Sequence, residues 1–204
     1  MKNFWAVGLI LLCGCMGNNK TCCFAPAVKS KTSGEYAFIN AKDSIEAFNG
    51  LTEKGIRPDY RIFLAEKILK DPSTYNPIGL LAVGIHCLKN DDYYWGTLLT
   101  RVAHLRAKID IAMSQDPSLQ SIPDEMLEQV RLSVPKLDEE KFKQAWDQVK
   151  QDALSWDKGS PRNYDRRWAS LRSEGRHTNA PLNYVGFSEE ARIVEEIHAS
   201  MKEG

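Results

Sequence analysis

The sequence lacks the short motifs that mark the common enzyme and cofactor families. It has no GxSxG, Walker-type phosphate loop, GxGxxG or HExxH pattern, so nothing in it selects a serine hydrolase, a nucleotide-binding protein or a zinc peptidase. Its four histidines are scattered, and no CxxC pair is followed by a second pair of ligands. We therefore expect no cofactor and no metal site. An enzyme is not favoured but stays open, because a cell-wall lytic enzyme can work with very few carboxylates.

The chain also lacks an excess of charge and a long hydrophobic run. It carries 27 basic and 27 acidic residues, and this balance gives no reason to expect a nucleic acid as partner. No apolar run approaches the roughly 20 residues that a membrane-spanning helix needs. The apolar fraction of 43% and the charged fraction of 26% are those of an ordinary globular domain.

The amino terminus has the pattern of a short signal peptide. Lys2 is followed by an uncharged apolar run over residues 4–12 and then by the motif Leu-Cys-Gly-Cys at 12–15. A positive residue, a short apolar core and small residues at the end of the core are typical of an exported chain. The alternative is a buried first helix of a cytosolic protein, but such a helix seldom begins at the second residue without a polar face.

The motif at 12–15 resembles the lipobox of bacterial lipoproteins. The resemblance implies cleavage after residue 14 and acylation of Cys15 by chains that include palmitate, which would make the membrane a partner through the anchor. Cys13 stands where Ala or Ser is usual. In Gram-negative lipoproteins an Asp after the acylated cysteine favours the inner membrane. Met16 follows here, so the resemblance implies an outer-membrane lipoprotein that faces the periplasm.

The five cysteines divide according to this prediction. Cys13 would leave with the signal peptide and Cys15 would carry lipid, so Cys22, Cys23 and Cys87 remain. A bridge from Cys22 or Cys23 to Cys87 would pin the amino-terminal segment to the domain. The alternative is that Cys87 is a small buried hydrophobic residue on a helix.

Three segments are expected along the chain. Residues 1–14 are the signal peptide, and residues 15–34 are a lipidated flexible tether that is rich in small and polar residues. Residues 35–204 form a single helical domain, because apolar residues recur at helical spacing and no strand-like alternation appears. The fold class predicted is all-α, an irregular multi-helix bundle. The helices are expected near residues 43–50, 58–70, 77–88, 93–115, 123–134, 138–158 and 188–197.

Two of these helices resemble a known hairpin. Residues 77–111 are similar to one helical hairpin of the tetratricopeptide or Sel1 type, with small residues that would allow close packing at 79, 82, 84, 103 and 107. No second copy occurs at a fixed period, so a repeat array is not predicted.

The strongest candidate site is a cluster of arginines and aromatic residues. Its members are Arg162, Tyr164, Arg166, Arg167, Trp168 and Arg172. Arginine and aromatic side chains are enriched at protein interfaces, so the segment is a candidate docking surface. The alternative is that Asp165 pairs with a neighbouring arginine while Tyr164 and Trp168 fill the core, and the two interpretations can both hold.

A second candidate lies on the longest predicted helix. Arg101, His104 and Lys108 follow one another at steps of three and four, so they share one stripe of the helix. This stripe would form a basic groove, or it would simply be the solvated side of the helix.

The function expected from these features is a lipid-anchored helical protein of the cell envelope, acting as a protein-binding or adaptor module. A periplasmic immunity protein that neutralises a toxin is a second interpretation of the same features. An envelope hydrolase directed at peptidoglycan and a purely structural lipoprotein are the third and the fourth.

Overall fold

The structure is a computed structural model that describes residues 44–53, 55–114, 116–164, 166, 168–171 and 185–203. Within these ranges the secondary structure is helical and no β-strand occurs, which confirms the predicted all-α class. The predicted signal peptide and the tether lie outside the described residues. No helix in the described ranges is long and apolar enough to cross a membrane.

The helices follow the chain in an order close to the prediction. Their bounds are α1 Ser44–Thr52, α2 Pro58–Lys70, α3 Pro77–Lys89, α4 Tyr93–Met113, the 3₁₀ helix η2 Pro117–Leu119, α5 Ile122–Ser133, α6 Glu139–Gln148, α7 Lys150–Gly159, α8 Trp168–Leu171 and α9 Phe187–Glu203.

Local sequence sets the starts of several helices. Asn76 accepts hydrogen bonds from the backbone N–H groups of Ile78 and Gly79 through its side chain, and Pro77 occupies the first turn of α3. Asp92 caps α4 in the same way, by accepting from the N–H of Trp95. Such caps satisfy amide groups that have no partner within the helix. A proline in the first turn loses nothing, because its position needs no amide hydrogen.

One expected helix is divided in two. The pattern over 138–158 predicts a continuous helix, but Val149, with a ψ angle of 4°, separates α6 from α7. Val149 is fully buried, and so is Ala153 in the next turn. The bend lets apolar residues of both helices face α4, whereas a straight helix would turn part of this surface away. The sequence pattern does not show the bend because helical spacing continues through it.

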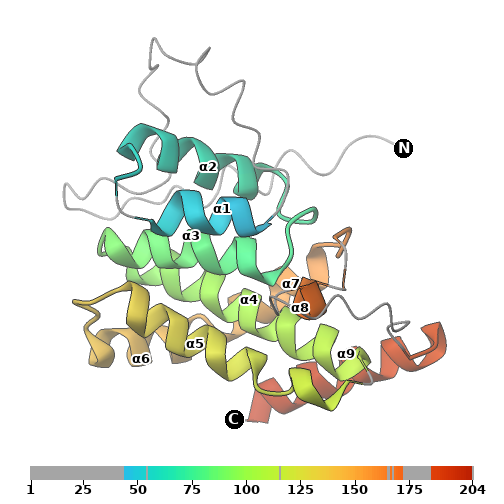
Figure 1. Ribbon diagram of the computed structural model, residues 1–204. Helices are drawn as coiled ribbons and strands as arrows, with labels where there is room; N and C mark the ends of the chain where they lie inside the picture. The colour runs from blue at the N-terminus through green and yellow to red at the C-terminus, as the bar shows by residue number, and fades with distance from the viewer. Residues whose placement is uncertain are drawn as a thin grey trace, which may run out of the picture.

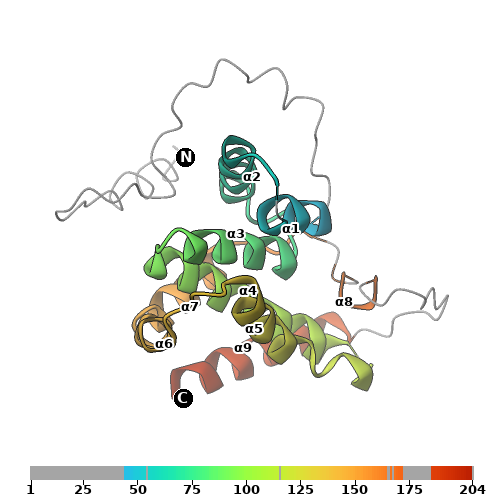
Figure 2. The same cartoon turned by 60° about the vertical axis from the view of Figure 1, so that its left-hand side comes forward.

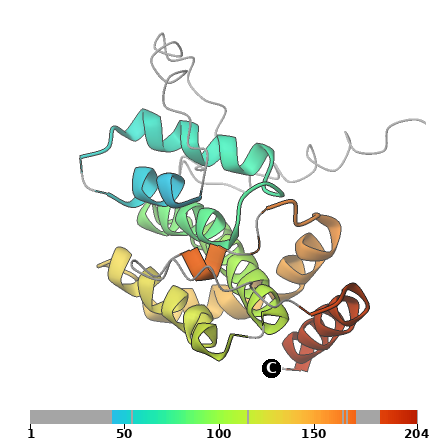
Figure 3. The same cartoon turned by 45° about the vertical axis from the view of Figure 1, so that its right-hand side comes forward.

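The α3–α4 hairpin forms the centre of the bundle. Figures 1 and 2 show α1 and α2 on one side of it and α5, α6 and α9 on the other. Figure 3 shows α9 as an outer helix beside the carboxyl-terminal half of α4. The main core extends from α1 to α8, and a smaller apolar cluster of Leu105, Ile109, Met113, Leu154 and Ile193 lies between α4, α7 and α9.

Two glycines let α3 and α4 approach closely. A Cβ atom on Gly84 would lie 2.6 Å from Thr100 Oγ1, and one on Gly96 would lie 2.6 Å from Leu88 Cγ and 2.9 Å from Leu88 N. Any larger side chain would therefore push the helices apart. The sequence predicts this role for Gly84 but not for Gly96.

Helix α4 is buried on almost every side, whereas its sequence predicts one core face. Arg101 and His104 lie beneath α6, where the Arg101 guanidinium sits 4.7 Å from the ring centre of Trp146. His104 meets the same ring edge-on, and burial lowers its pKa to about 4. Only Lys108 of the predicted basic stripe is exposed. The stripe is thus neither a groove nor a solvated face. The charge of Arg101 is covered by the ring of Trp146 and by the Trp146 carbonyl oxygen, which accepts a hydrogen bond from Arg101.

Candidate functional site

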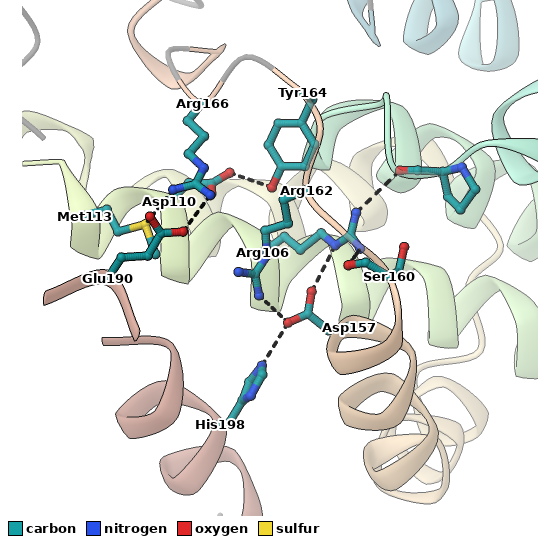
Figure 4. Close-up of polar contacts among 11 residues, drawn as sticks. Arg106, Asp110, Met113, Asp157, Ser160, Arg162, Tyr164, Arg166, Glu190 and His198 are labelled. Atoms are coloured by element: carbon teal, nitrogen blue, oxygen red, sulfur yellow. Dashed lines mark hydrogen bonds and ion pairs between the residues drawn. The ribbon is translucent and has the colours of Figure 1, made fainter. Parts of the chain in front are cut away.

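A buried ion pair lies where α4 meets the end of α7 (Figure 4). Arg106 on α4 is fully buried, and its Nε donates to Asp157 Oδ1 on α7 at 3.0 Å. The other nitrogens of the guanidinium donate to the carbonyl oxygens of Pro72, at 3.4 Å, and Ser160, at 3.2 Å. A buried arginine is tolerated only when its charge and its donors are matched. Arg106 meets this condition by joining three separate parts of the chain.

The second oxygen of Asp157 binds two further groups. Arg162 donates to Asp157 Oδ2 through Nη2, and His198 Nε2 on α9 lies 2.8 Å from the same oxygen. Burial alone would raise the pKa of Asp157, but the Arg162 charge, the His198 hydrogen bond and the Arg106 charge together hold this pKa below its usual value. The carboxylate is therefore ionised, and it links α4, α7, α9 and the segment after α7.

A second buried carboxyl fastens Tyr164 and Trp168, in the segment after α7, onto α4. Asp110 Oδ2 accepts from the hydroxyl of Tyr164 at 2.8 Å and from Nε1 of Trp168 at 2.9 Å. Burial raises the pKa of Asp110 to about 6, although these two hydrogen bonds and the charges of nearby arginines oppose the shift. The aromatic residues are thus held in the core by their polar ends.

An ion pair connects the same segment to α9. Arg166 Nη2 lies 2.6 Å from Glu190 Oε1, and Arg166 Nη1 lies 3.4 Å from the sulfur of Met113. The hydrogen bond from Arg166 lowers the pKa of Glu190. Because the Arg166 side chain keeps 30% of its surface exposed, this pair is accessible to a ligand, unlike the pair of Arg106 and Asp157.

The structure brings together four of the six predicted docking residues. Tyr164 and Trp168 are buried, as the second interpretation of the segment expects, so their rings are not available as a surface. Arg162 and Arg166 line a pocket. Arg167 and Arg172 lie outside the described residues, and so does Asp165.

Sequence reasoning missed the residues that hold this cluster in place. They are Arg106, Asp110, Asp157, Glu190 and His198. A signal was present at Arg106 and Asp110, because two charged residues one helical turn apart lie next to core positions of the longest helix. For Asp157 and His198 no local pattern shows that they meet.

The pocket lies between the end of α7, residues 160–162 with Arg166, and α9, and its volume is about 610 Å³. Its basic lining residues are Lys158, Arg162, Arg166, His198 and Lys202. Its acidic ones are Asp157, Glu190 and Glu195, and apolar contact comes from Pro161, Ala191, Val194 and Ala199. A pocket of this size holds a small molecule or a few residues of a peptide.

Two of the carboxyl groups in the pocket, those of Asp157 and Glu190, are poorly suited to acid catalysis. A general acid for glycoside hydrolysis needs a raised pKa, whereas the pKa values of Asp157 and Glu190 are lowered. The carboxyl with the raised pKa, Asp110, is not among the lining residues and is occupied by Tyr164 and Trp168. The arrangement favours recognition of a charged group over proton transfer.

Neither a metal centre nor a relative assigns a function to this pocket. Among the residues that the structure describes, no group of three or more His, Cys, Asp or Glu side chains is placed to hold a metal ion. No protein-family model, no curated protein and no solved structure matches the chain.

Proposed function

We propose that this chain is a lipid-anchored protein of the bacterial cell envelope whose helical domain binds a protein partner through the pocket between α7 and α9. The motif at 12–15 supports the anchor, with Cys15 as the acylated residue and the periplasmic face of the outer membrane as its place. Several acyl chains on one cysteine would hold the protein firmly, whereas one chain binds only marginally.

The observation that carries the binding proposal is the fixed position of Arg162 in the pocket wall. Its guanidinium is bound by Asp157, which Arg106 and His198 hold in turn. A side chain that is already ordered loses little entropy when a partner binds, so more of the contact energy appears as affinity. Arginine is also one of the residues enriched at interface hot spots.

The hydrolase interpretation receives less support from the same site. Asp157 and Glu190 are committed to arginines and have lowered pKa values, so neither is a good proton donor at neutral pH. The proposal is accordingly a binding function without a chemical step.

Metabolic labelling with radioactive palmitate tests the anchor. Wild type and a Cys22→Ser control should take up label, because Cys22 lies beyond the proposed acylated residue. The Cys15→Ala variant should take up none. Equal labelling of Cys15→Ala and wild type would show that Cys15 is not the residue that takes up the label.

Affinity capture from envelope extract tests partner binding. Lys158 and Lys202 are exposed residues at the edge of the pocket, so their replacement by glutamate changes its charge without opening the core. Lys143→Glu on α6 is the matched control, because Lys143 is exposed and lies outside the pocket. We expect the wild type and the control to recover the same protein and the Lys158→Glu/Lys202→Glu variant to lose it. Recovery that is equal in all three would contradict the proposed site.

A further inference from the structure

The pocket has a small excess of positive charge. Four permanent cations line it, namely Lys158, Arg162, Arg166 and Lys202, and three carboxylates do so, namely Asp157, Glu190 and Glu195. Arg106 stands directly behind Asp157 at 3.0 Å and adds a positive charge. Asp110, which interacts electrostatically with Arg162 and Arg166, adds a negative one when it is ionised. The balance favours a single negative charge as ligand over a neutral or cationic group.

Arg162 has hydrogen-bonding capacity that the protein does not use. Its Nη2 donates to Asp157. Its Nε is buried without a hydrogen-bond partner and is out of reach of a ligand, so Nη1 is the nitrogen left to donate to one. The side chain retains 11% of its surface exposed and lines the pocket. A planar guanidinium held on one side by a carboxylate can present its other edge to a second carboxylate. The buried cluster therefore prepares Arg162 as a donor towards the pocket.

The remaining lining residues select among anions. Glu190 and Glu195 would repel a doubly charged phosphate group more strongly than a singly charged carboxylate. Ala191, Val194 and Ala199 on α9 offer apolar contact for the methylene groups of a side chain. These two features suit an aspartate or glutamate within a peptide better than a free phosphate.

We propose that the pocket binds the carboxylate of an aspartate or glutamate in an acidic segment of the protein partner, with Arg162 as the main contact and Lys158 and Lys202 at the edge. This inference rests on the proposed protein-binding function and specifies the chemistry of the partner. The full pocket would accept the acidic residue together with its immediate neighbours in the partner's chain.

Calorimetric titration of the full-length chain in detergent tests the chemistry directly. The probes are acetyl-Gly-Glu-Glu-Gly-amide, its Gln-Gln analogue and inorganic phosphate. We expect the acidic peptide to bind more tightly than either of the other two. Arg162→Lys keeps the positive charge beside Asp157 but removes the planar fork, and its Kd for the acidic peptide should rise about tenfold, which is the loss of one charged hydrogen bond.

Two further variants keep the test valid if Arg162→Lys folds poorly. Lys158→Gln/Lys202→Gln alters only exposed side chains and should raise the Kd about threefold to tenfold. Lys143→Gln, on the exposed surface of α6 outside the pocket, should leave the Kd unchanged. The inference is overturned if the glutamine peptide or phosphate binds as tightly as the acidic peptide, or if the Lys158→Gln/Lys202→Gln variant binds like wild type.

The titration and the capture experiment can fail independently of each other. If the Lys158→Glu/Lys202→Glu variant loses its partner but no acidic peptide binds the pocket, partner binding stands and the carboxylate chemistry is wrong. If acidic peptides bind in an Arg162-dependent way but capture is unaffected, the carboxylate site stands and the protein-binding function is wrong.

Discussion

Removing the carboxylate of Asp157 should strongly destabilise the protein. Asp157→Asn keeps the size of the side chain but leaves the buried charge of Arg106 and the partly exposed charge of Arg162 without a counter-ion. The side chains of Arg106 and Asp157 are 1% and 0% exposed, so water cannot compensate. Breaking a buried pair by removing one partner costs about 3–5 kcal/mol, which is a large part of the roughly 5–15 kcal/mol that stabilises a typical domain.

A double-mutant cycle isolates the interaction. Arg106→Met replaces the buried cation with an apolar side chain and should restore part of the stability lost in Asp157→Asn, because the unmatched charge is then gone. Urea unfolding followed by circular dichroism at pH 7 measures the free energy of unfolding of all four proteins. Asp147→Asn, an exposed acid on α6, is the control and should lie within about 0.5 kcal/mol of wild type.

The dependence on pH gives the same prediction a second readout. The pKa of Asp157 is lower in the folded protein than in the unfolded chain, so its contribution is fully present above the unfolded pKa and is lost as pH falls through the folded one. The gap between wild type and Asp157→Asn should therefore narrow in acid. An Asp157→Asn variant as stable as the Asp147→Asn control at pH 7, or strictly additive effects in the cycle, would refute the role given to the cluster.

Two further predictions concern other buried positions. Gly96→Ala should lower the stability measured by thermal unfolding by about 1–3 kcal/mol, because its Cβ would meet Leu88. Gly159→Ala is the control, since a Cβ there meets nothing within 4 Å, and it should change stability little. Equal effects of the two substitutions would rule out a close approach of α3 and α4. The pKa of Asp110 is about 6 in the folded protein against its ordinary value of 3.8. The stability that protonated Asp110 contributes in wild type is therefore full below the lower pKa and is lost as pH rises through the higher one, a loss of about 3 kcal/mol. Asp110→Asn should remove this fall in stability between pH 4 and 7. An unchanged pH profile in Asp110→Asn would contradict the burial of its charge.

The sequence alone predicts most of the helices because their signals are local. Proline in the first turn, a capping side chain such as that of Asn76 or Asp92, and helical spacing of apolar residues all lie within one element. The division at Val149 escapes such reasoning, since it depends on how two helices share the surface of α4. The burial of Arg101 escapes it too, because only the packed α6 supplies the ring and the carbonyl that cover the charge.

The candidate site could be predicted only in part for the same reason. The cluster of arginines and aromatics after residue 160 is visible in the sequence, and its composition indicates a binding segment. Its partners Asp110 and Glu190 lie far away along the chain, and nothing local shows that they converge. Composition therefore finds the segment, whereas long-range packing decides that Trp168 is buried and that Arg162 faces a pocket.

The most direct test of partner binding is site-specific photo-crosslinking in living cells. A benzophenone side chain placed at Ala199 would stand in the pocket wall on α9, and one placed at Lys143 on α6 would stand outside it. We expect the Ala199 position to crosslink to one envelope protein with an acidic segment and the Lys143 position not to do so. No crosslinked protein at Ala199, or the same product from both positions, would contradict the proposed partner binding.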